Sequence, residues 1–243
     1  MRRRSAPAAG DANVKRILVL FAKPPTAGVA KTRLAEALGV EGAAAIAAAL
    51  LEDTFTLCEN VRFEDGSKPD LVIAYAEGKD FFDEAVDCRA AYDRWKLLAQ
   101  GKGNLGERLD KALADIAPGE DDQTVFVGMD APHLPPERVA EAFARLGAAR
   151  AVLGPCDDGG YYLVGVRGRW PFGILAPVRW STNEAMADTV GAFEKVGMDV
   201  ATLEMWYDID DLAGLGRLAA DLKEMPPTAL SMTRVALREL GLG

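Results

Sequence analysis

The sequence is poor in the residues that form disulfides and nitrogen–sulfur metal sites. Its three cysteines, Cys58, Cys88 and Cys156, are widely spaced, and His133 is its only histidine. An odd, scattered set of cysteines argues against a disulfide framework and favours a reducing compartment, so we expect a cytoplasmic protein. A single histidine excludes a Cys–His metal cluster. Because a lone histidine among prolines is more often packed or exposed than reactive, we assign His133 no catalytic role.

Long apolar runs and an excess of basic charge are also missing. No apolar run approaches the roughly 20 residues that span a bilayer, and the basic N-terminus is not followed by the apolar segment of a secretory signal. The 37 acidic and 28 basic residues leave a formal charge of −9, which argues against nucleic-acid binding. A small phosphorylated ligand stays compatible with this charge because a few local cations are enough to bind it.

Short apolar runs alternate with helical patterns along the chain, which predicts βαβ units and a mainly parallel sheet with helices on both faces. The expected strands are 16–22, 70–75, 95–100, 124–128, 151–155, 160–166 and 200–206. The expected helices are 31–38, 41–60, 79–91, 108–117, 136–146, 181–196, 212–225 and 228–240, and Ser181 with Glu184 matches a capping box. The tight connection before the sixth strand is too short for a parallel crossover, so that strand should be antiparallel or perpendicular. We expect a disordered tail over 1–13 and a single domain over 14–243.

Asp130 follows the buried fourth strand, and the prolines after it end the strand. In open α/β sheets, ligands bind beyond the carboxyl ends of the strands. A carboxylate at this place suits a hard divalent cation that shares its oxygen ligands with a phosphate. The alternative is that Asp130 only caps the helix that begins near Pro136.

The loop after the first strand, residues 23–33, concentrates positive charge. Lys23 lies at the tip of the strand, Gly28 permits a positive φ, and Lys31 and Arg33 lie where a helix begins. Backbone amides, helix dipole and cations together favour an anion, so we predict phosphate binding over a merely solvated basic turn. The loop matches neither the Walker A pattern nor the dinucleotide fingerprint.

A glycine-rich segment follows the third strand. Gly103 permits close approach of a base or ribose, and Asn104 offers both a donor and an acceptor. The alternative is an ordinary turn in which Asn104 caps the next helix.

A sharp acidic turn connects the fifth and sixth strands. Asp157 and Asp158 are candidates for binding acceptor hydroxyls or for acting as a general base. Gly159, Gly160 and Tyr161 complete the turn, and Trp180 is a further candidate for the acceptor side. The alternative is an Asp-Gly turn with its tyrosines in the core.

Carboxylates also end the last expected strand. Asp208 and Asp210 alternate along the chain, so both can face one side and supply further metal oxygens beside Asp130. The alternative is that Asp210 or Asp211 caps the following helix.

Six motifs occur in order along the chain. They are KPPxxGxxKTRL (23–34), GNLGER (103–108), GMDAP (128–132), GPCDDGGYYL (154–163), WST (180–182) and DID (208–210). The ordered set resembles a bacterial family of glycosyltransferase-like proteins in the nucleotide-diphospho-sugar transferase superfamily, distantly similar to phospholactate guanylyltransferases and molybdenum-cofactor nucleotidyltransferases. The chain departs from the family pattern at Asn104, where Asp is usual, and at Asp211 and Gly214, which replace Thr and Asp.

The resemblance implies a three-layer α/β/α fold of the GT-A type, a nucleotide-activated donor and a Mg²⁺ or Mn²⁺ ion at Asp130. One hypothesis is transfer of a sugar from a nucleotide-diphospho-sugar to a small acceptor. Another is transfer of a nucleotidyl group from a nucleoside triphosphate to a phosphorylated small molecule, and a third is nucleotide binding without catalysis. Because Asp157 and Asp158 would repel a phosphorylated acceptor, we favour glycosyl transfer. The base, the sugar, the acceptor and the oligomeric state are open at this level.

Overall fold

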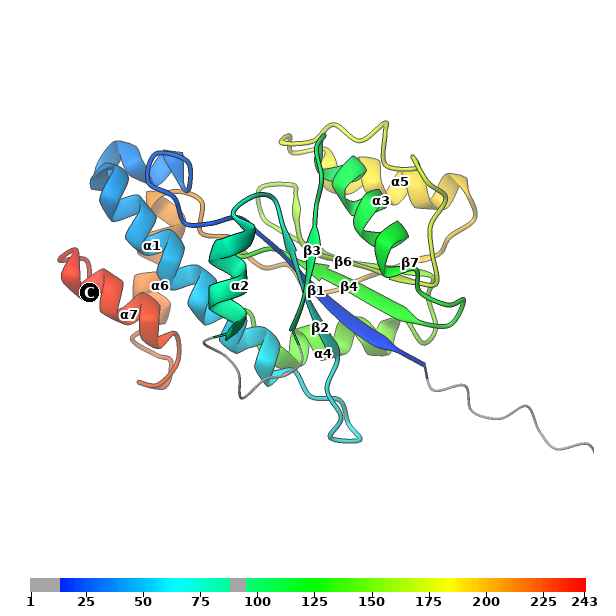
Figure 1. Cartoon of the computed structure of the whole chain (residues 1–243), viewed down its shortest axis with the longest axis horizontal. Helices are drawn as coiled ribbons and strands as arrows, with labels where there is room; N and C mark the ends of the chain where they lie inside the picture. The colour runs from blue at the N-terminus through cyan, green and yellow to red at the C-terminus, as the bar shows by residue number, and fades with distance from the viewer. Residues whose placement is uncertain (1–13, 88–94) are drawn as a thin grey trace, which may run out of the picture.

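Seven strands form one mixed sheet in the computed structural model, which describes residues 14–87 and 95–243 (Figure 1). The strands are β1 (Arg16–Ala22), β2 (Asp70–Tyr75), β3 (Trp95–Ala99), β4 (Gln123–Val127), β5 (Ala151–Pro155), β6 (Tyr161–Arg167) and β7 (Val200–Thr202). They are ordered β3-β2-β1-β4-β6-β5-β7. Every neighbouring pair is parallel except those that β6 makes with β4 and β5. The predicted mainly parallel sheet is therefore confirmed, and of the two orientations expected for the sixth strand, antiparallel or perpendicular, the structure shows the antiparallel one.

Helices cover both faces of the sheet, as the alternating pattern predicts. They are α1 (Thr32–Asn60), α2 (Lys79–Asp87), α3 (Leu105–Ile116), α4 (Pro136–Arg145), α5 (Ala185–Lys195), α6 (Leu212–Asp221) and α7 (Ser231–Glu239). Alternate residues of β1 enter different cores: Leu18 packs with α1, α2 and α4, whereas Val19 packs with α3 and α5. This is the period of two of a strand buried on both sides. The result is a three-layer α/β/α fold.

A third apolar cluster joins α1 to the C-terminal helices α6 and α7 beside the sheet (Figure 1). By length and composition α1 could cross a membrane, but half of its most apolar window is buried, and the core helix of a soluble protein passes the same test. The helix is also kinked at Gly39, whose φ of 73° and ψ of 165° are not helical. This kink separates the two helical stretches that the sequence predicts. As evidence for a membrane span, α1 is weak.

Several predicted boundaries need correction. The capping box of Ser181 and Glu184 does not form: Ser181 has a φ of 60°, and α5 begins only at Ala185 with no side-chain cap. The last strand is short, because β7 ends at Thr202 and only an isolated bridge between Cys156 and Trp206 continues it. Helix α3 begins at Leu105, earlier than predicted, because Asn104 caps it.

Some expectations fall on residues 1–13 and 88–94, outside the described part of the chain. These are the N-terminal tail, the end of the helix predicted over 79–91, and Cys88. Cys58 and Cys156 are buried free thiols.

The strand order changes direction at β1. From β1 the chain adds β2 and then β3 on one side, after which β4 pairs with the other side of β1. The connections leave β1 and β4 in opposite directions, so a crevice opens beyond the carboxyl ends of these two strands. Lys23 follows β1 and Asp130 follows β4, which brings both to this crevice.

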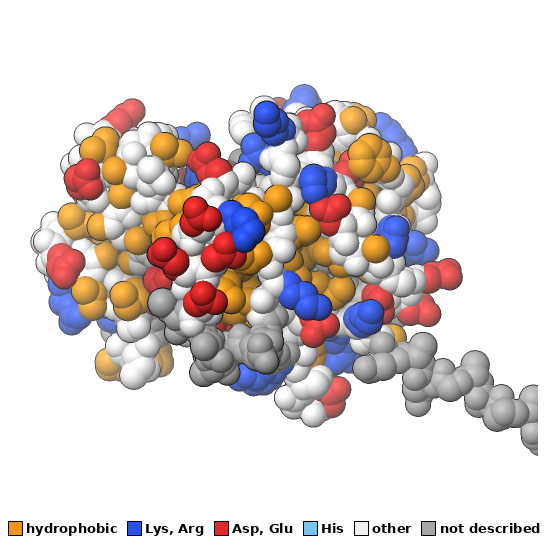
Figure 2. All heavy atoms as spheres, viewed as in Figure 1, with side chains coloured by type: hydrophobic (Ala, Val, Ile, Leu, Met, Phe, Trp, Pro, Cys, Tyr) orange, Lys and Arg blue, Asp and Glu red, His pale blue; other side chains and the backbone are white. Residues whose placement is uncertain are grey.

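The surface seen in Figure 2 carries a group of acidic side chains over α2, and the cationic side chains are dispersed among acidic ones elsewhere on this face. Within α2, Asp80 and Glu84 are exposed. The distribution agrees with the acidic composition of the chain.

Candidate functional site

Two adjoining cavities lie at the crevice. The first, here called the apolar cavity, has a volume of about 290 Å³ and is floored by Phe21, Phe126 and Leu163. The second, here called the charged cavity, has a volume of about 270 Å³ and is lined by Lys31, Arg33 and Asp210 among others. Lys23, Met129 and Asp130 line both. The two cavities therefore adjoin at these three shared residues.

A buried lysine joins two carboxylates in the charged cavity. The ammonium of Lys31 donates to Asp130 and, at 2.7 Å, to an oxygen of Asp210. The Lys31 side chain is only 5% exposed, whereas those of Asp130 and Asp210 are 42% and 44% exposed. The alternative that Asp130 merely caps α4 is not supported, because Pro135 occupies the cap position and no side chain bonds there.

Backbone contacts bring these distant residues together. The amide of Ile209 donates to the carbonyl of Asp130 at 2.9 Å, which ties the Asp208–Asp210 segment to the end of β4. Lys31 has a left-handed backbone, with φ 49° and ψ 50°, immediately before α1. A non-glycine residue in this region carries strain that the surrounding contacts must offset. The two ion pairs of Lys31 provide such contacts.

The proximity of Lys31 to several carboxylates shifts the pKa values of these groups. Burial alone would lower the pKa of Lys31, but the charges of Asp130 and Asp210 outweigh it and raise that pKa. Burial, followed by the negative charges of Asp210, Asp158 and Asp130, raises the pKa of Asp208 to about 6. Burial would raise the pKa of Asp210, but the charge and hydrogen bond of Lys31, together with the charges of Arg33 and Lys23, outweigh burial and lower that pKa. Lys31 is therefore a charged ammonium in a cluster with excess negative charge.

The predicted phosphate-binding cations are gathered at this place. Lys23 and Arg33 line the charged cavity with Lys31, and both act on the pKa of Asp210. Gly28 has the expected positive φ, 77°, in the turn that leads to α1. It lies in the loop but does not line the cavity, whereas its neighbours Val29 and Ala30 do.

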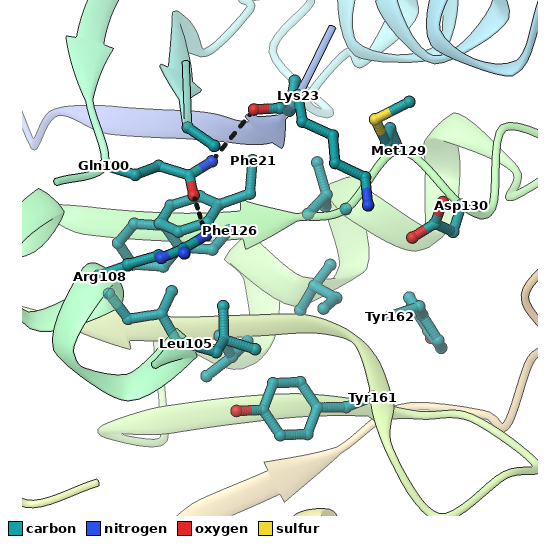
Figure 3. A pocket seen from close by; sticks show the side chains of 17 residues that line it. Phe21, Lys23, Gln100, Leu105, Arg108, Phe126, Met129, Asp130, Tyr161 and Tyr162 are labelled. Carbon is teal, nitrogen blue, oxygen red and sulfur yellow. Dashed lines mark hydrogen bonds between the residues drawn. The ribbon is translucent and has the colours of Figure 1, made fainter. Parts of the chain in front are cut away.

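The apolar cavity has polar groups at one end. The buried Gln100 donates its amide to the carbonyls of Ala22 (3.3 Å) and Ala74 (2.6 Å). Its oxygen is thereby directed to Arg108, whose Nη1 lies 3.5 Å away. Figure 3 shows this pair at one end of the cavity and the Lys23 and Asp130 side chains together at the other. A planar apolar group could lie between the two ends.

Gly103 and Asn104 do not line either cavity. The Asn104 side chain accepts from the amide of Glu107 at 3.0 Å, and Glu107 returns a bond to the Asn104 amide, so the capping interpretation applies. The carbonyl of Gly103 accepts from Arg108 Nε at 2.9 Å. Gly103 thus holds Arg108, which lines the apolar cavity with Leu105, while Gly103 and Asn104 themselves do not reach it.

Residues 157–160 of the acidic turn line neither of the two cavities. Asp157 is paired with Arg217 of α6 at 3.1 Å, and Asp158 accepts from the amide of Gly160 at 2.8 Å, as in an Asp-Gly turn. Gly159 has a φ of 86°, and a Cβ there would lie 2.2 Å from the carbonyl oxygen of Asn183. Glycine is therefore required by both conformation and space. Asp158 nevertheless influences Asp208, so the turn borders the carboxylate cluster.

Tyr161 and Trp180 pack against each other, with ring centroids 6.3 Å apart. Tyr161 lines the apolar cavity, whereas Trp180 does not. Tyr162 also lines the cavity and donates its hydroxyl to the carbonyl of Glu204 at 3.0 Å.

Comparison with known proteins identifies the family to which this sequence belongs. The family model described as "uncharacterized protein conserved in bacteria" (DUF2064) matches residues 60–182, just over half of the chain. The chain belongs to the DUF2064 family. A comparison with curated proteins gives no match.

Solved structures share the fold of this DUF2064 protein. A candidate nucleotide-diphospho-sugar transferase from Desulfovibrio desulfuricans G20 is 26% identical, with a TM-score of 0.77 over 93% of this chain and 98% of that one. A cytidylyltransferase from Leptospira borgpetersenii is 10% identical (TM-score 0.56, 93% and 95% covered). CMP:2-keto-3-deoxy-manno-octonic acid synthetase in complex with CTP is 13% identical (TM-score 0.54, 87% and 100% covered). The predicted nucleotide-diphospho-sugar transferase fold is confirmed.

Sequence reasoning missed the polar end of the apolar cavity in this DUF2064 protein. Gln100 and Arg108 flank the glycine-rich segment, and Arg108 belongs to a quoted motif, yet neither was assigned a role. The signal was available, because Gln100 directly follows a strand at its carboxyl end, as Lys23 does. The sequence did not indicate that Phe21 and Phe126 line a cavity, because both lie in apolar strands that are expected to be buried in the core.

The residues present fit a divalent cation that is shared with a ligand. Asp130 and Asp210 already converge on one positive charge, and the carboxylate of Asp208 lies close enough to feel the charges of both. Within residues 14–87 and 95–243, no group of three or more His, Cys, Asp or Glu side chains forms a ready metal site. The protein would thus supply few ligands, with phosphate and water oxygens completing the shell, as is common for Mg²⁺.

Proposed function

We propose that this protein is a metal-dependent transferase that uses a nucleotide-activated donor, and that it transfers a sugar from a nucleotide-diphospho-sugar to a small acceptor. The observation that carries the proposal is the adjoining pair of cavities, one apolar and one charged, that share Lys23 and Asp130 in their linings. A nucleotide has the same division: a flat, largely apolar base and a chain of negative phosphates.

In this proposal the nucleoside lies in the apolar cavity. The faces of Phe21 and Phe126 provide apolar contact, and Gln100 holds the Arg108 guanidinium ready to donate to acceptor atoms on the base edge. A planar guanidinium discriminates between acceptor patterns better than a point charge does. Base selectivity is therefore assigned to this end of the site.

The diphosphate lies in the charged cavity. Lys23, Lys31 and Arg33 bind its oxygens, and charge-assisted bonds of this kind are about twice as strong as neutral ones. Asp130 and Asp210, with Asp208 beside them, would hold Mg²⁺ or Mn²⁺. When bound, such an ion would neutralise the negative charge that develops on the departing nucleoside diphosphate.

The acceptor enters from the side of the acidic turn. Asp158 belongs to this turn and is assigned to accept a proton from an acceptor hydroxyl. Asp157 is less suited, because its charge is engaged by Arg217. A neutral polyol is the acceptor class that best matches this surface.

Nucleotidyl transfer from a nucleoside triphosphate is the second candidate. The specific observation in its favour is the group of three cations around the charged cavity, which suits a triphosphate as well as a diphosphate. The Arg217–Asp157 pair also reduces the repulsion that a phosphorylated acceptor would meet.

Product analysis separates the two reactions. The protein is incubated with Mn²⁺ and one member at a time of a panel of nucleotide sugars and nucleoside triphosphates, with pooled small acceptors. Release of nucleoside diphosphate from a nucleotide sugar supports glycosyl transfer, whereas release of pyrophosphate supports nucleotidyl transfer and overturns the first proposal. Metal-dependent binding without turnover indicates a nucleotide-binding protein. If no nucleotide binds with or without metal, both catalytic proposals are wrong.

A further inference from the structure

Lys31 occupies the position between the two carboxylates that a divalent cation would need. Its ammonium contacts Asp130 and Asp210 at the same time and is shielded from solvent on nearly all sides. A Mg²⁺ or Mn²⁺ ion bound to the same oxygens would lie about 2.0–2.2 Å from them, within a few ångströms of the ammonium. At such a distance two cations repel strongly in a partly buried site.

We propose that Lys31 is a tethered counter-ion that holds the carboxylate pair closed to metal until a phosphate-bearing ligand draws the ammonium away. This inference rests on the proposed function, because it concerns the regulation of that same site. It assigns Lys31 two alternative partners: the Asp130–Asp210 pair in the free protein, and ligand phosphate in the complex.

The first observation behind the proposal is the position of Lys31 in the chain. Lys31 directly precedes α1 in the loop that lines the charged cavity, so its flexible side chain can reach a phosphate there without movement of the helix. Lys23 and Arg33 line the same cavity and would attract that phosphate independently. A phosphate therefore brings a competing negative charge next to the ammonium.

The second observation is the charge imbalance around the ammonium. Asp130 and Asp210 converge on the ammonium, and the negative charges of Asp208 and Asp158 act in the same region. Once Lys31 turns to a phosphate, the carboxylates lose their nearest positive charge, and a divalent ion becomes the most favourable replacement. Metal and phosphate ligand should consequently bind with positive cooperativity, which is a coupling between two sites.

The test measures Mn²⁺ binding without any nucleotide, by the loss of the free-ion electron paramagnetic resonance signal. Wild type should bind weakly. Lys31→Met should bind at least about tenfold more tightly, because the competing charge is gone. Lys31→Arg keeps the charge and should stay weak. Arg33→Met removes a cation from the same cavity without vacating the carboxylates, and should change the affinity by less than about threefold.

The double variant Lys31→Met, Asp210→Asn tests whether the gain arises at the carboxylate pair. It should lose the gain of Lys31→Met. Circular dichroism confirms folding of each variant. We expect Lys31→Met to fold because Asp130 and Asp210 keep enough exposure for water to solvate them. If Lys31→Met is destabilised, its melting temperature is measured with and without Mn²⁺. A larger increase on adding Mn²⁺ than wild type shows would report the same gain in Mn²⁺ affinity.

Sulfate tests the second half of the proposal, because it resembles a phosphate and binds Mn²⁺ weakly. Sulfate should strengthen Mn²⁺ binding to wild type relative to chloride at equal ionic strength, and should leave Lys31→Met unchanged. Equal or weaker Mn²⁺ binding by Lys31→Met, or no sulfate effect on wild type, overturns the proposal.

These outcomes are distinguishable from failure of the proposed function. If nucleotide sugars bind and turn over but Lys31→Met shows no gain in Mn²⁺ affinity, only the counter-ion proposal is wrong. If the gain appears but no nucleotide binds, the counter-ion proposal stands as a property of the carboxylate cluster and the proposed function is wrong.

Discussion

The charged cavity and the apolar cavity adjoin at Lys23 and Asp130, yet they are built in different ways. The charged cavity depends on side chains from three loops: Lys31 is 99 positions from Asp130 and 179 from Asp210. The apolar cavity is made largely from strand ends and the first turns of α3, which are held by backbone pairing and by the buried Gln100.

This difference indicates that the two cavities bind different parts of the ligand. Flexible charged side chains can follow phosphates and an ion as these enter and leave, whereas rigid strands and a capped helix present a fixed surface to a base. Substitutions in the charged cavity should therefore affect every nucleotide alike, and substitutions at the polar end of the apolar cavity should depend on the base.

The largest effect is expected at the boundary. Asp130→Ala should lower the metal-dependent affinity for nucleotide by at least about a hundredfold, because an ion and its phosphate partner both lose a ligand. Calorimetric titration of the nucleotide with and without Mn²⁺ measures the change. Glu36→Gln, on the exposed side of α1, is the matched control and should bind normally. Unchanged binding of both ligands by Asp130→Ala would remove Asp130 from the site.

Substitution within the charged cavity should have the next largest effect. Lys31→Ala should weaken nucleotide binding about fiftyfold, to a similar extent for every base, because a charge-assisted contact to phosphate is lost. Titrating uridine, guanosine, cytidine and adenosine diphosphates in turn tests this. A loss that appears with one base alone contradicts the assignment of Lys31 to phosphate.

The polar end of the apolar cavity should respond in the opposite manner. Arg108→Met should weaken binding of the preferred nucleotide about tenfold and reduce the selectivity between bases, because one directed donor is lost from the base edge. Pyrophosphate, which has no base, should bind as it does to wild type. Equal weakening for all bases and for pyrophosphate would place Arg108 with the phosphate-binding groups.

The smallest effect is expected outside both cavities, at His133. This buried side chain packs against Tyr207, with ring centroids 4.1 Å apart, and burial is the main reason that its pKa is lowered to about 4. Between pH 6.5 and 4 the unfolded chain binds a proton that the folded protein excludes, so the stabilising contribution of neutral His133 is present above pH 6.5 and is lost as the pH falls toward 4.

His133→Phe should remove this contribution while keeping the ring contact. Between pH 7 and pH 5.5, the free energy of unfolding of wild type should fall by about 1 kcal/mol more than that of the variant. Urea unfolding at the two pH values measures the difference. Parallel pH profiles would show that His133 does not titrate as described, and nucleotide binding at pH 7 should be the same in both proteins.

Much of the fold was predictable because its signals are local. Apolar runs such as 16–22 and 70–75 define strands by themselves, and the short turn before β6 requires an antiparallel strand whatever surrounds it. Predictions failed where neighbours compete with local preference. Ser181 has the correct spacing for a capping box, but the chain there adopts a different backbone and α5 begins later. At Asn104, where both a nucleotide contact and a helix cap were compatible with the sequence, the structure shows the cap of α3.

The sequence by itself determined which chemical groups follow each strand: cations after β1, an amide and a guanidinium around the glycine-rich segment after β3, and carboxylates after β4 and near the C-terminal helices. Only the tertiary structure decided which of them meet. The change of direction at β1 places Lys23 beside Asp130, and the hydrogen bond from Ile209 to Asp130 brings Asp210 to Lys31. The physical reason is that residue type and spacing control the backbone over a few positions, whereas contact between distant loops depends on the order in which the strands pair.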